Sequence, residues 1–313
     1  MKSLFECPLC GGKSCRRLLS AKDRMFELPG AFTFVKCQNC SAVSLFPMLS
    51  EAQVAPYYPP KKYYAYDSKG NGSFFAKLRT YLVRASNHPT PVSKILAMLL
   101  PNVPALPHLI TDGKILDVGC GVGDTLMLLK EFGWETFGMD IDEAAVGVAK
   151  KRGVDHVRVG FYQDISSYPD NYFDAVRLYH VIEHLDDPMR CLRLIKKKLK
   201  KGGQLIIGTP NVESFLAHIF GTYWYNLDAP RHLVLFSPLT LQQAVVRSGF
   251  SVSHVEFCSA GGLLGSIQYI LREKFGIRSN LIHTQWLVLL FYPFEWLIDR
   301  MNKGDVFVLR ATI

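Results

Sequence analysis

The sequence lacks any long unbroken apolar run. Its most hydrophobic stretch, WLVLLFYPFEWLI at residues 286–298, is too short to span a bilayer and is interrupted by Pro293 and Glu295. The first ten residues, MKSLFECPLC, also lack the apolar core of an export signal. We therefore expect a cytoplasmic protein. For residues 286–298, closure of a pocket, a dimer contact and peripheral contact with a membrane all stay open.

An excess of charge is also missing. Charged residues make up 20% of the 313 residues and hydrophobic residues 49%, which is typical of a globular protein and argues against long disorder. The net charge of +9 favours anionic partners without choosing among them. In the basic run RCLRLIKKKLKK, Leu and Ile recur at helical spacing, which indicates a helix packed on a sheet. We therefore do not expect a nucleic-acid partner.

Cysteine is concentrated near the N-terminus. Four of the eight cysteines form two C-x-x-C pairs separated by 26 residues, namely Cys7, Cys10, Cys37 and Cys40. Four thiolates at such spacing are typical of a closed, tetrahedral, structural zinc site in a reducing compartment. The string CPLCGG resembles the knuckle of a zinc ribbon. We therefore predict a zinc ribbon in residues 1–50.

The rest of the chain divides into two parts. Residues 51–107 begin with a linker rich in Tyr, Pro and Lys and then turn helical from Phe74 to Leu100, where helices could cap a neighbouring site. Residues 108–313 alternate strand-like and helix-like segments, which predicts a mainly parallel α/β sheet with helices on both faces. Ligands of such sheets bind at the carboxyl ends of the strands.

Two segments interrupt this alternation. We interpret residues 211–240 as a lid and residues 260–303 as a hydrophobic insertion.

A glycine loop follows the first of these strands. The string ILDVGCGVGDTL has the pattern G-x-G-x-G and lacks the third glycine of the dinucleotide-binding fingerprint G-x-G-x-x-G. An acidic residue, Asp140, ends the next strand about twenty residues later, where ribose hydroxyls are bound in nucleoside sites. The pattern therefore indicates a nucleoside-containing ligand.

The strings LDVGCGVG, GMDID, YFDAVRLYHVIEHLDDP and KKGGQLIIGTPN, in this order, resemble the class I S-adenosylmethionine-dependent methyltransferases. The resemblance covers about residues 114–210 and the final strands. It implies a Rossmann-like methyltransferase fold with a seven-stranded, mainly parallel sheet, here with a small zinc-ribbon module in front. It also implies S-adenosylmethionine as the cofactor.

The resemblance assigns roles to the glycine loop. Gly119, Cys120 and Gly121 would pass under the methionine part of the cofactor, and Asp117 would help to hold its positive end. Alternatively, Asp117 only braces the glycine turn.

It also assigns roles to the residues around the nucleoside. Asp140 would hold the ribose, Ile141 would pack on the adenine and Asp164 would accept a hydrogen bond from the adenine amino group. Alternatively, Asp164 caps a loop.

The string HVIEH, residues 180–184, matches the H-x-x-E-H pattern of some zinc hydrolases. That chemistry requires both histidines on one helix, but the preceding residues are strand-like and Pro188 fits the first position of the following helix. We therefore do not expect catalytic zinc here. Glu183 and His184 are expected to fix the loop, while Tyr179 and His180 face either the cofactor or the acceptor.

Methyl transfer to oxygen requires alignment and removal of a proton. Candidate bases are His180, His184 and His232, and Arg231 could hold a phosphate or carboxylate of the acceptor. Arg231 and His232 lie in APRHLVLFSPLTL, which resembles the segment that folds over the acceptor in methyltransferases of small molecules and glycans. Alternatively, His232 only connects the lid to the core.

We therefore expect an enzyme that methylates a small-molecule, sugar or glycan-type acceptor at oxygen, in a pathway such as polysaccharide biosynthesis. Two alternatives stay open: an RNA or protein methyltransferase that docks through the ribbon, and a non-catalytic partner protein that binds the cofactor. The sequence leaves the oligomeric state undecided.

Overall fold

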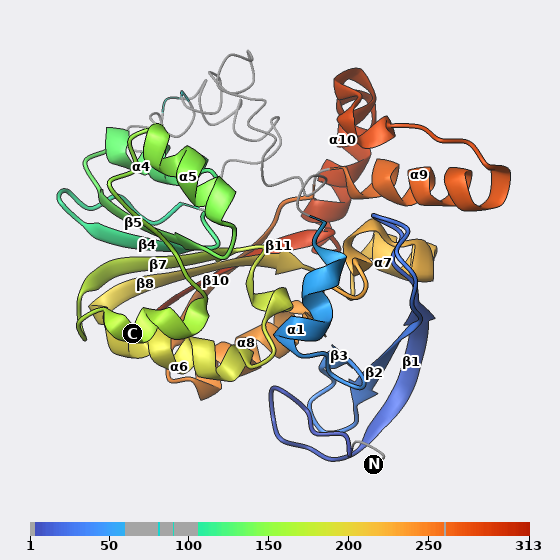
Figure 1. The fold of residues 1–313 in the computed structure, drawn as a ribbon, viewed down its shortest axis with the longest axis horizontal. Helices are drawn as coiled ribbons and strands as arrows, with labels where there is room; N and C mark the ends of the chain where they lie inside the picture. Colours follow the sequence, from blue (N-terminus) through green and yellow to red (C-terminus); the bar gives the residue numbers. More distant parts are fainter. Residues whose placement is uncertain (1–3, 60–80, 82–89, 91–105, 260) are drawn as a thin grey trace.

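The structure, a computed structural model, describes residues 4–59, 81, 90, 106–259 and 261–313. The predicted cap helices between Phe74 and Leu100 lie almost wholly outside the described residues. Within the described ranges the chain forms two β-sheets with helices around them (Figure 1).

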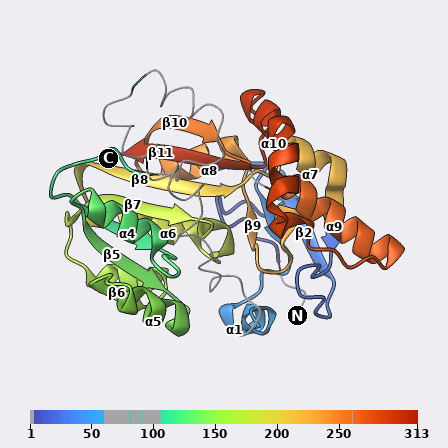
Figure 2. The same ribbon diagram turned by 90° about the horizontal axis from the view of Figure 1, so that it is seen from above.

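The larger sheet has seven strands in the order β10-β11-β8-β7-β4-β5-β6, with β10 at one edge and β6 at the other (Figure 2). Five neighbouring strands from β6 to β8 are parallel, and β11 runs antiparallel to both β8 and β10. The predicted seven-stranded, mainly parallel sheet is thus confirmed. Its strands are β4 (Lys114–Val118), β5 (Glu135–Asp140), β6 (His156–Val159), β7 (Phe173–Tyr179), β8 (Leu199–Pro210), β10 (Ser251–Phe257) and β11 (Val306–Thr312).

Helices cover both faces of this sheet. Figure 1 shows α4 (Asp124–Glu131) and α5 (Glu143–Lys151) on one side and α6 (Pro188–Lys198) and α8 (Pro238–Arg247) on the other. Central strands are therefore covered on both sides, and most residues of β4 and β7 are buried. Pro188 begins α6, and the carboxylate of Asp187 accepts a hydrogen bond from Arg190 N, as the sequence predicts.

The smaller sheet combines strands from the N-terminal region with one strand from the segment after β8. Three strands come from the predicted ribbon, β1 (Cys15–Ala21), β2 (Phe32–Cys37) and β3 (Val43–Leu45). The fourth, β9 (Val234–Leu235), comes from the segment predicted as a lid and pairs antiparallel with β3. The ribbon sheet is therefore completed by a strand from beyond the glycine loop.

The predicted lid, residues 211–240, is largely buried. It contains α7 (Phe215–Phe220), two 3-10 turns (η5, Gly221–Tyr223; η6, Tyr225–Leu227) and β9. Side chains from Ala229 to Phe236 are all buried, with Arg231 and Val234 at 0% exposure. The segment therefore connects β8 of the large sheet to β9 of the small sheet, with most of its side chains buried.

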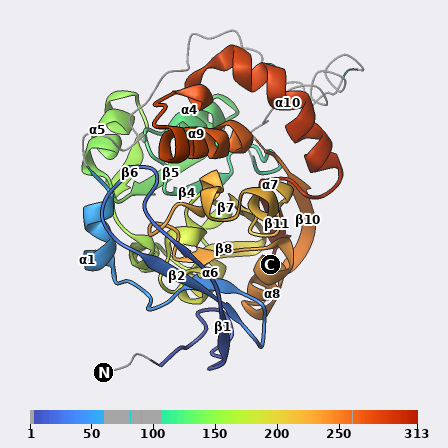
Figure 3. The same cartoon turned by 90° about the vertical axis from the view of Figure 1, so that its right-hand side faces the viewer.

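The predicted hydrophobic insertion folds as two helices. They are α9 (Gly262–Phe275) and α10 (Gln285–Arg300), joined through η7 (Leu281–His283), and Figure 3 shows them side by side at one end of the molecule. In the part of the chain that is described, none of the helices has the length and apolar character needed to cross a membrane. The short elements that remain are α1 (Glu51–Val54), η1 (Ala55–Tyr57), η3 (Tyr162–Ser167) and η4 (Ile182–His184).

Candidate active site and zinc centre

A cavity of about 730 Å³ opens at the carboxyl ends of β4, β5 and β7. This is where ligands of parallel α/β sheets bind. It is lined by nine of the residues singled out from the sequence: Asp117, Gly119, Cys120, Gly121, Asp140, Ile141, Tyr179, His180 and His184.

The glycine loop needs its glycines for two different reasons. Gly119 and Gly121 have φ of +72° and +53°, a conformation that glycine adopts easily. A Cβ on Gly119 would lie 2.3 Å from Val181 Cγ2, whereas a Cβ on Gly121 would meet nothing within 4 Å. Gly121 therefore leaves open space beside the cavity, into which a ligand can approach the backbone.

Asp140 is positioned by the same loop. Its Oδ2 accepts a hydrogen bond of 2.7 Å from Gly121 N, and its Oδ1 accepts one of 3.0 Å from Asp142 N. Burial raises the pKa of Asp140, while these backbone bonds oppose that shift. Ile141 follows with its side chain 56% exposed at the cavity. Both side chains thus line the cavity, and their contacts with ribose and adenine stay predictions.

Asp117 has a partner that the sequence analysis missed. Arg177 on β7 donates to both carboxylate oxygens of Asp117, at 2.9 and 3.0 Å, and both side chains are buried. Burial raises the pKa of Asp117, and the Arg177 charge opposes the rise. The signal was the single arginine within FDAVRLY, a mostly apolar strand whose other charged residue is Asp174. This pair forms part of the cavity wall, and it leaves both roles considered for Asp117 open.

Asp164 is not among the described residues that line the cavity. Its Oδ2 accepts a hydrogen bond of 2.8 Å from Phe161 N at the start of η3. This contact fits the alternative in which Asp164 caps a loop, while Gly160, Phe161 and Tyr162 line the cavity in its place.

His180 directly follows β7 and has a strained backbone conformation. Its φ is +55°, which is uncommon for a residue with a side chain and concentrates at functional sites. Its ring packs edge-on against Tyr179, and its Nδ1 lies 3.2 Å from Glu183 Oε1. Because Nδ1 faces the carboxylate, Nε2 is the nitrogen available to a molecule in the cavity. His180 and His184 do not share a helix, as predicted, because only Ile182–His184 form the turn η4.

Glu183 is buried behind His180, at 1% exposure. Its Oε2 accepts a hydrogen bond of 2.9 Å from Thr209 Oγ1. Burial would raise the pKa of Glu183, but the hydrogen bond with His180 and the neighbouring imidazoles outweigh it and lower the pKa to about 2. The side chain is therefore a fixed carboxylate that orients His180.

His184 also lines the cavity, and a residue of the N-terminal region meets it there. Tyr58 Oη lies 3.0 Å from His184 Nδ1, and Tyr58 itself lines the cavity. The sequence analysis missed Tyr58, because the tyrosine-rich segment around it shows no periodic pattern that would single out one ring.

The described residues that line this cavity do not include His232 or Arg231. His232 is 5% exposed, its Nδ1 lies 2.9 Å from Asn226 O, and burial lowers its pKa to about 4. Arg231 is fully buried and donates to Asp228, to Asp23 and to Tyr57 O. These contacts do not favour direct contact of either side chain with an acceptor.

The four N-terminal cysteines come together as predicted. Their Sγ atoms lie within 4.8 Å of one another, with Cys7 and Cys40 at 3.5 Å and Cys10 and Cys37 at 3.7 Å. A tetrahedral zinc with bonds of about 2.3 Å sets its sulfur atoms about 3.8 Å apart, so the cluster matches that geometry. Gly12 N also points at Cys10 Sγ, at 3.4 Å. The cluster can hold a structural zinc ion.

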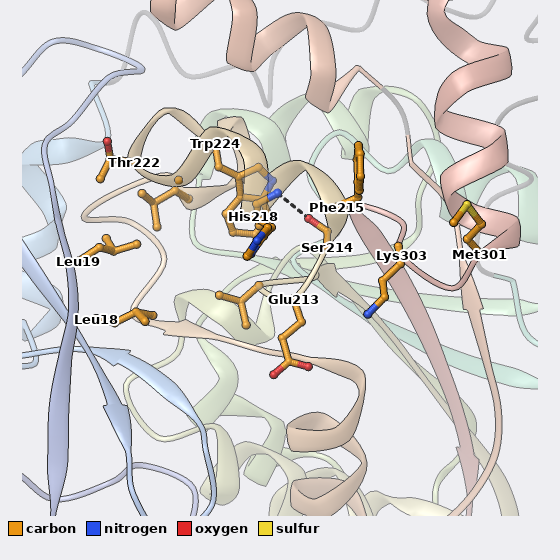
Figure 4. A pocket seen from close by; sticks show the side chains of 14 residues that line it. Leu18, Leu19, Glu213, Ser214, Phe215, His218, Thr222, Trp224, Met301 and Lys303 are labelled. Atoms are coloured by element: carbon orange, nitrogen blue, oxygen red, sulfur yellow. Dashed lines mark hydrogen bonds between the residues drawn. The ribbon is translucent and has the colours of Figure 1, made fainter.

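A second cavity, of about 830 Å³, lies between β1 and α7 (Figure 4). Its wall is mostly apolar, with Leu18, Phe215 and Trp224, and it carries the charged Glu213 and Lys303. The two cavities share no lining residue. The glycine loop and the candidate catalytic side chain of His180 are at the first cavity.

Comparison with known families gives one match that covers just over half of the chain. The family described as "Methyltransferase domain" matches residues 91–255 of the 313 residues. This range includes the glycine loop, β4 to β8 and the segment through β9.

Individual relatives and solved structures are also similar to this chain. The chain is 34% identical over 148 residues to the ubiquinone biosynthesis O-methyltransferase of Idiomarina loihiensis, covering 42% of this chain and 60% of that protein. It is 31% identical over 103 residues to the protein of the same name from Xanthomonas oryzae pv. oryzae, covering 31% of this chain and 43% of that protein. A SAM-dependent methyltransferase from Archaeoglobus fulgidus aligns at 24% identity and a TM-score of 0.47, covering 77% of this chain and 98% of that one. The chain thus spans about half the length of the curated relatives it matches.

Proposed function

Because the chain belongs to the methyltransferase-domain family that matches its residues 91–255, we propose that it transfers a methyl group from S-adenosylmethionine to a hydroxyl oxygen of a small-molecule acceptor. The observation that carries this proposal is the cavity at the glycine loop, with Asp140 on one side and His180 on the other. The similarity to proteins named O-methyltransferases supports oxygen as the target atom. A sugar or glycan acceptor is one form of this proposal, supported by the sequence resemblance alone.

The residues at the cavity fit the cofactor. Gly119, Cys120 and Gly121 would lie along its methionine part, because Gly121 leaves open space there. Asp140 and Ile141 would hold the ribose and the adenine. When bound, S-adenosylmethionine supplies a methyl group on a positively charged sulfur, which keeps the electron pair of the broken bond.

We assign the proton transfer to His180. The acceptor hydroxyl would give its proton to His180 Nε2 as its oxygen bonds to the methyl carbon. Glu183 holds the ring through Nδ1, and Thr209 holds Glu183 in turn. An imidazole fixed by a carboxylate is a common form of general base. The contact of Arg231 with Asp23 instead supports a role in holding the segment around β9 to the ribbon, and the contact of His232 with Asn226 O supports a role within that segment.

We further propose that the ribbon binds zinc and that this zinc has a structural role. We also propose that the exposed apolar face of α10, which carries Trp286 and Leu290, contacts membranes. The apolar side chains of α10 point outward: Trp286 and Leu290 are 65% and 63% exposed. Its acidic Glu295 instead turns inward and accepts hydrogen bonds from Gly261 N and Leu263 N at the start of α9. An exposed basic residue, Arg300, ends α10, which suits an anionic bilayer.

The direct test is a transfer assay with S-adenosylmethionine labelled in the methyl group, run against panels of phenols, catechols and sugar nucleotides. We expect labelled product from one hydroxyl-bearing class and tight binding of S-adenosylhomocysteine in calorimetry. Binding of S-adenosylhomocysteine without transfer to any panel would favour a non-catalytic cofactor-binding protein, and transfer to RNA or protein would replace the small-molecule acceptor.

A further inference from the structure

We propose that Glu183, His184 and His232 together bind a divalent metal ion in the wall of the cofactor cavity. One potential ligand atom from each side chain lies within 4.8 Å of the other two. Glu183 and His232 are buried, whereas His184 lines the cavity, so an ion held by the three would be accessible from that side. The inference deepens the proposed function and rests on it, since the ion would act in the same reaction.

The hydrogen bonds of the His184 and His232 rings use Nδ1 and leave Nε2 able to bind an ion. His232 Nδ1 lies 2.9 Å from Asn226 O, and His184 Nδ1 lies 3.0 Å from Arg231 O. A carbonyl oxygen can only accept, so each Nδ1 carries the proton and each Nε2 keeps a lone pair. Tyr58 Oη, 3.0 Å from His184 Nδ1, is then a second acceptor for the proton on that nitrogen. Metal-binding histidines have this arrangement, in which the second nitrogen donates to a carbonyl or carboxylate.

The carboxylate of Glu183, the third proposed ligand, is also fixed by hydrogen bonds. Thr209 Oγ1 lies 2.9 Å from one oxygen of Glu183, and His180 Nδ1 lies 3.2 Å from the other. A carboxylate has about four lone-pair positions, so these two bonds leave room for an ion. Two imidazoles and one carboxylate form a ligand set of catalytic zinc and of non-haem iron(II), both of which keep an open position.

The proposed site differs from both metal patterns in the sequence. The H-x-x-E-H pattern would use His180, whereas the structure brings in His232 from the segment that follows β8. The site also shares no residue with the four cysteines of the ribbon. It exists only because the segment leading into β9 folds back against η4, where Leu233 N donates to Glu183 O.

An ion at this site would act as a Lewis acid. An acceptor hydroxyl on the open position becomes more acidic, and its proton can pass to His180 as the oxygen takes the methyl group. An acceptor with a second oxygen next to the reacting hydroxyl would bind as a chelate. We therefore expect catechols or vicinal diols to be better acceptors than isolated hydroxyls.

Cobalt(II) tests the site without reference to activity, because thiolate and imidazole–carboxylate ligands give the ion different absorption spectra. The metal-free chain is titrated with Co²⁺ alone, and bound metal per chain is measured alongside the spectrum. We expect the wild type to bind a second ion with a nitrogen–oxygen spectrum. His232→Gln and Glu183→Gln should each lose that ion and keep the thiolate-bound one, and the control His218→Gln, at the second cavity, should keep both.

Thermal unfolding of the metal-free variants shows which of them fold, and His184→Gln replaces any that does not. The inference is overturned if the wild type binds only the thiolate-held ion in excess Co²⁺, or if the second ion persists in all three variants. Calorimetry with S-adenosylhomocysteine on the same samples separates the two proposals. Normal cofactor binding without a second ion would remove the metal site and leave the methyltransferase function standing.

Discussion

Arg231 Nη2 lies 2.8 Å from Asp23 Oδ1, and both side chains are fully buried although 208 residues separate them. The same guanidinium is bound by Asp228 and donates to Tyr57 O, and it lies over the ring of Phe26. One arginine after β8 is therefore the polar centre of the contact between the N-terminal region and the segment that leads into β9.

Replacing this arginine should destabilise the fold. In Arg231→Met, two buried carboxylates lose their partner, and removing one member of a buried pair typically costs about 3–5 kcal/mol of unfolding free energy. Urea denaturation measures the loss. Lys22→Met is the matched control, because Lys22 forms a half-exposed ion pair of the kind worth about 0–1 kcal/mol. If Arg231→Met were as stable as the wild type but no longer bound an anionic acceptor, Arg231 would instead have the role predicted from the sequence, which is to hold a phosphate or carboxylate of the acceptor.

Asp140 and Asp164, both predicted from the sequence to contact the cofactor, should differ in their effect on cofactor affinity. Asp140→Ala removes a carboxylate at the cavity, and charge-assisted hydrogen bonds are worth about 1.5–3 kcal/mol, so binding of S-adenosylhomocysteine should weaken about 10- to 100-fold. Asp164→Ala removes only the cap on Phe161 N and should leave affinity unchanged. Calorimetry gives both constants, and equal losses would return Asp164 to the adenine contact.

His180→Gln should lower kcat by about 100-fold or more, the usual contribution of a general base, while S-adenosylhomocysteine binds as tightly as before. Steady-state kinetics with the acceptor found in the transfer assay provide the test. His218→Gln, at the other cavity, should leave kcat unchanged. Full turnover in His180→Gln would mean that another group, or the solvent, takes the proton.

Asp305 should make stability depend on pH. Burial raises its pKa from 3.8 to about 7, against the hydrogen bonds that Trp224 and Ser214 donate. The folded chain then holds this proton more tightly than the unfolded chain, so the carboxyl stabilises the fold below pH 4 and loses that contribution as pH rises to 7.

The contribution of Asp305 should change by up to about 1.4 kcal/mol per pH unit across that window. It is measured as the difference in unfolding free energy between the wild type and Asp305→Asn. A difference that stays flat from pH 4 to pH 7 would show that Asp305 keeps an ordinary pKa.

The outward face of α10 should bind anionic vesicles. Leu290→Glu places a charge in the middle of the apolar face and should reduce co-sedimentation with phosphatidylglycerol vesicles at least tenfold. Val246→Glu alters an equally exposed apolar side chain on α8 and should leave binding unchanged. A wild-type dimer that dissociates in Leu290→Glu, with no vesicle binding, would instead assign this face to a second copy of the chain.

Local patterns in the sequence predicted most of the parallel sheet. Pro188 and the aspartates before it fix the start of α6, and the glycine loop marks the end of β4, because such signals act within a few residues. Long-range pairings could not be foreseen in the same way. Nothing in the string RHLVLF indicates that Val234 and Leu235 join the ribbon sheet, and a two-residue strand has no periodicity to detect.

The candidate site was predictable to a similar degree. Residues in family-like strings, such as Asp140 and His180, do lie at the cavity. Tyr58 and Arg177 were missed, because their roles come from partners far away in the sequence. The same reason explains why the meeting of His232 with Glu183 and His184 escaped the sequence analysis.

The pairing of β3 with β9 sets an order of events during synthesis. The cysteines and the three strands of the ribbon leave the ribosome before β9, so the edge of β3 stays open until Val234 and Leu235 have been made. By then the chain has already passed through β4 to β8, so the ribbon sheet begins early and is completed late. A fragment cut at residue 50 would carry that open edge permanently, and exposed edges of this kind invite aggregation.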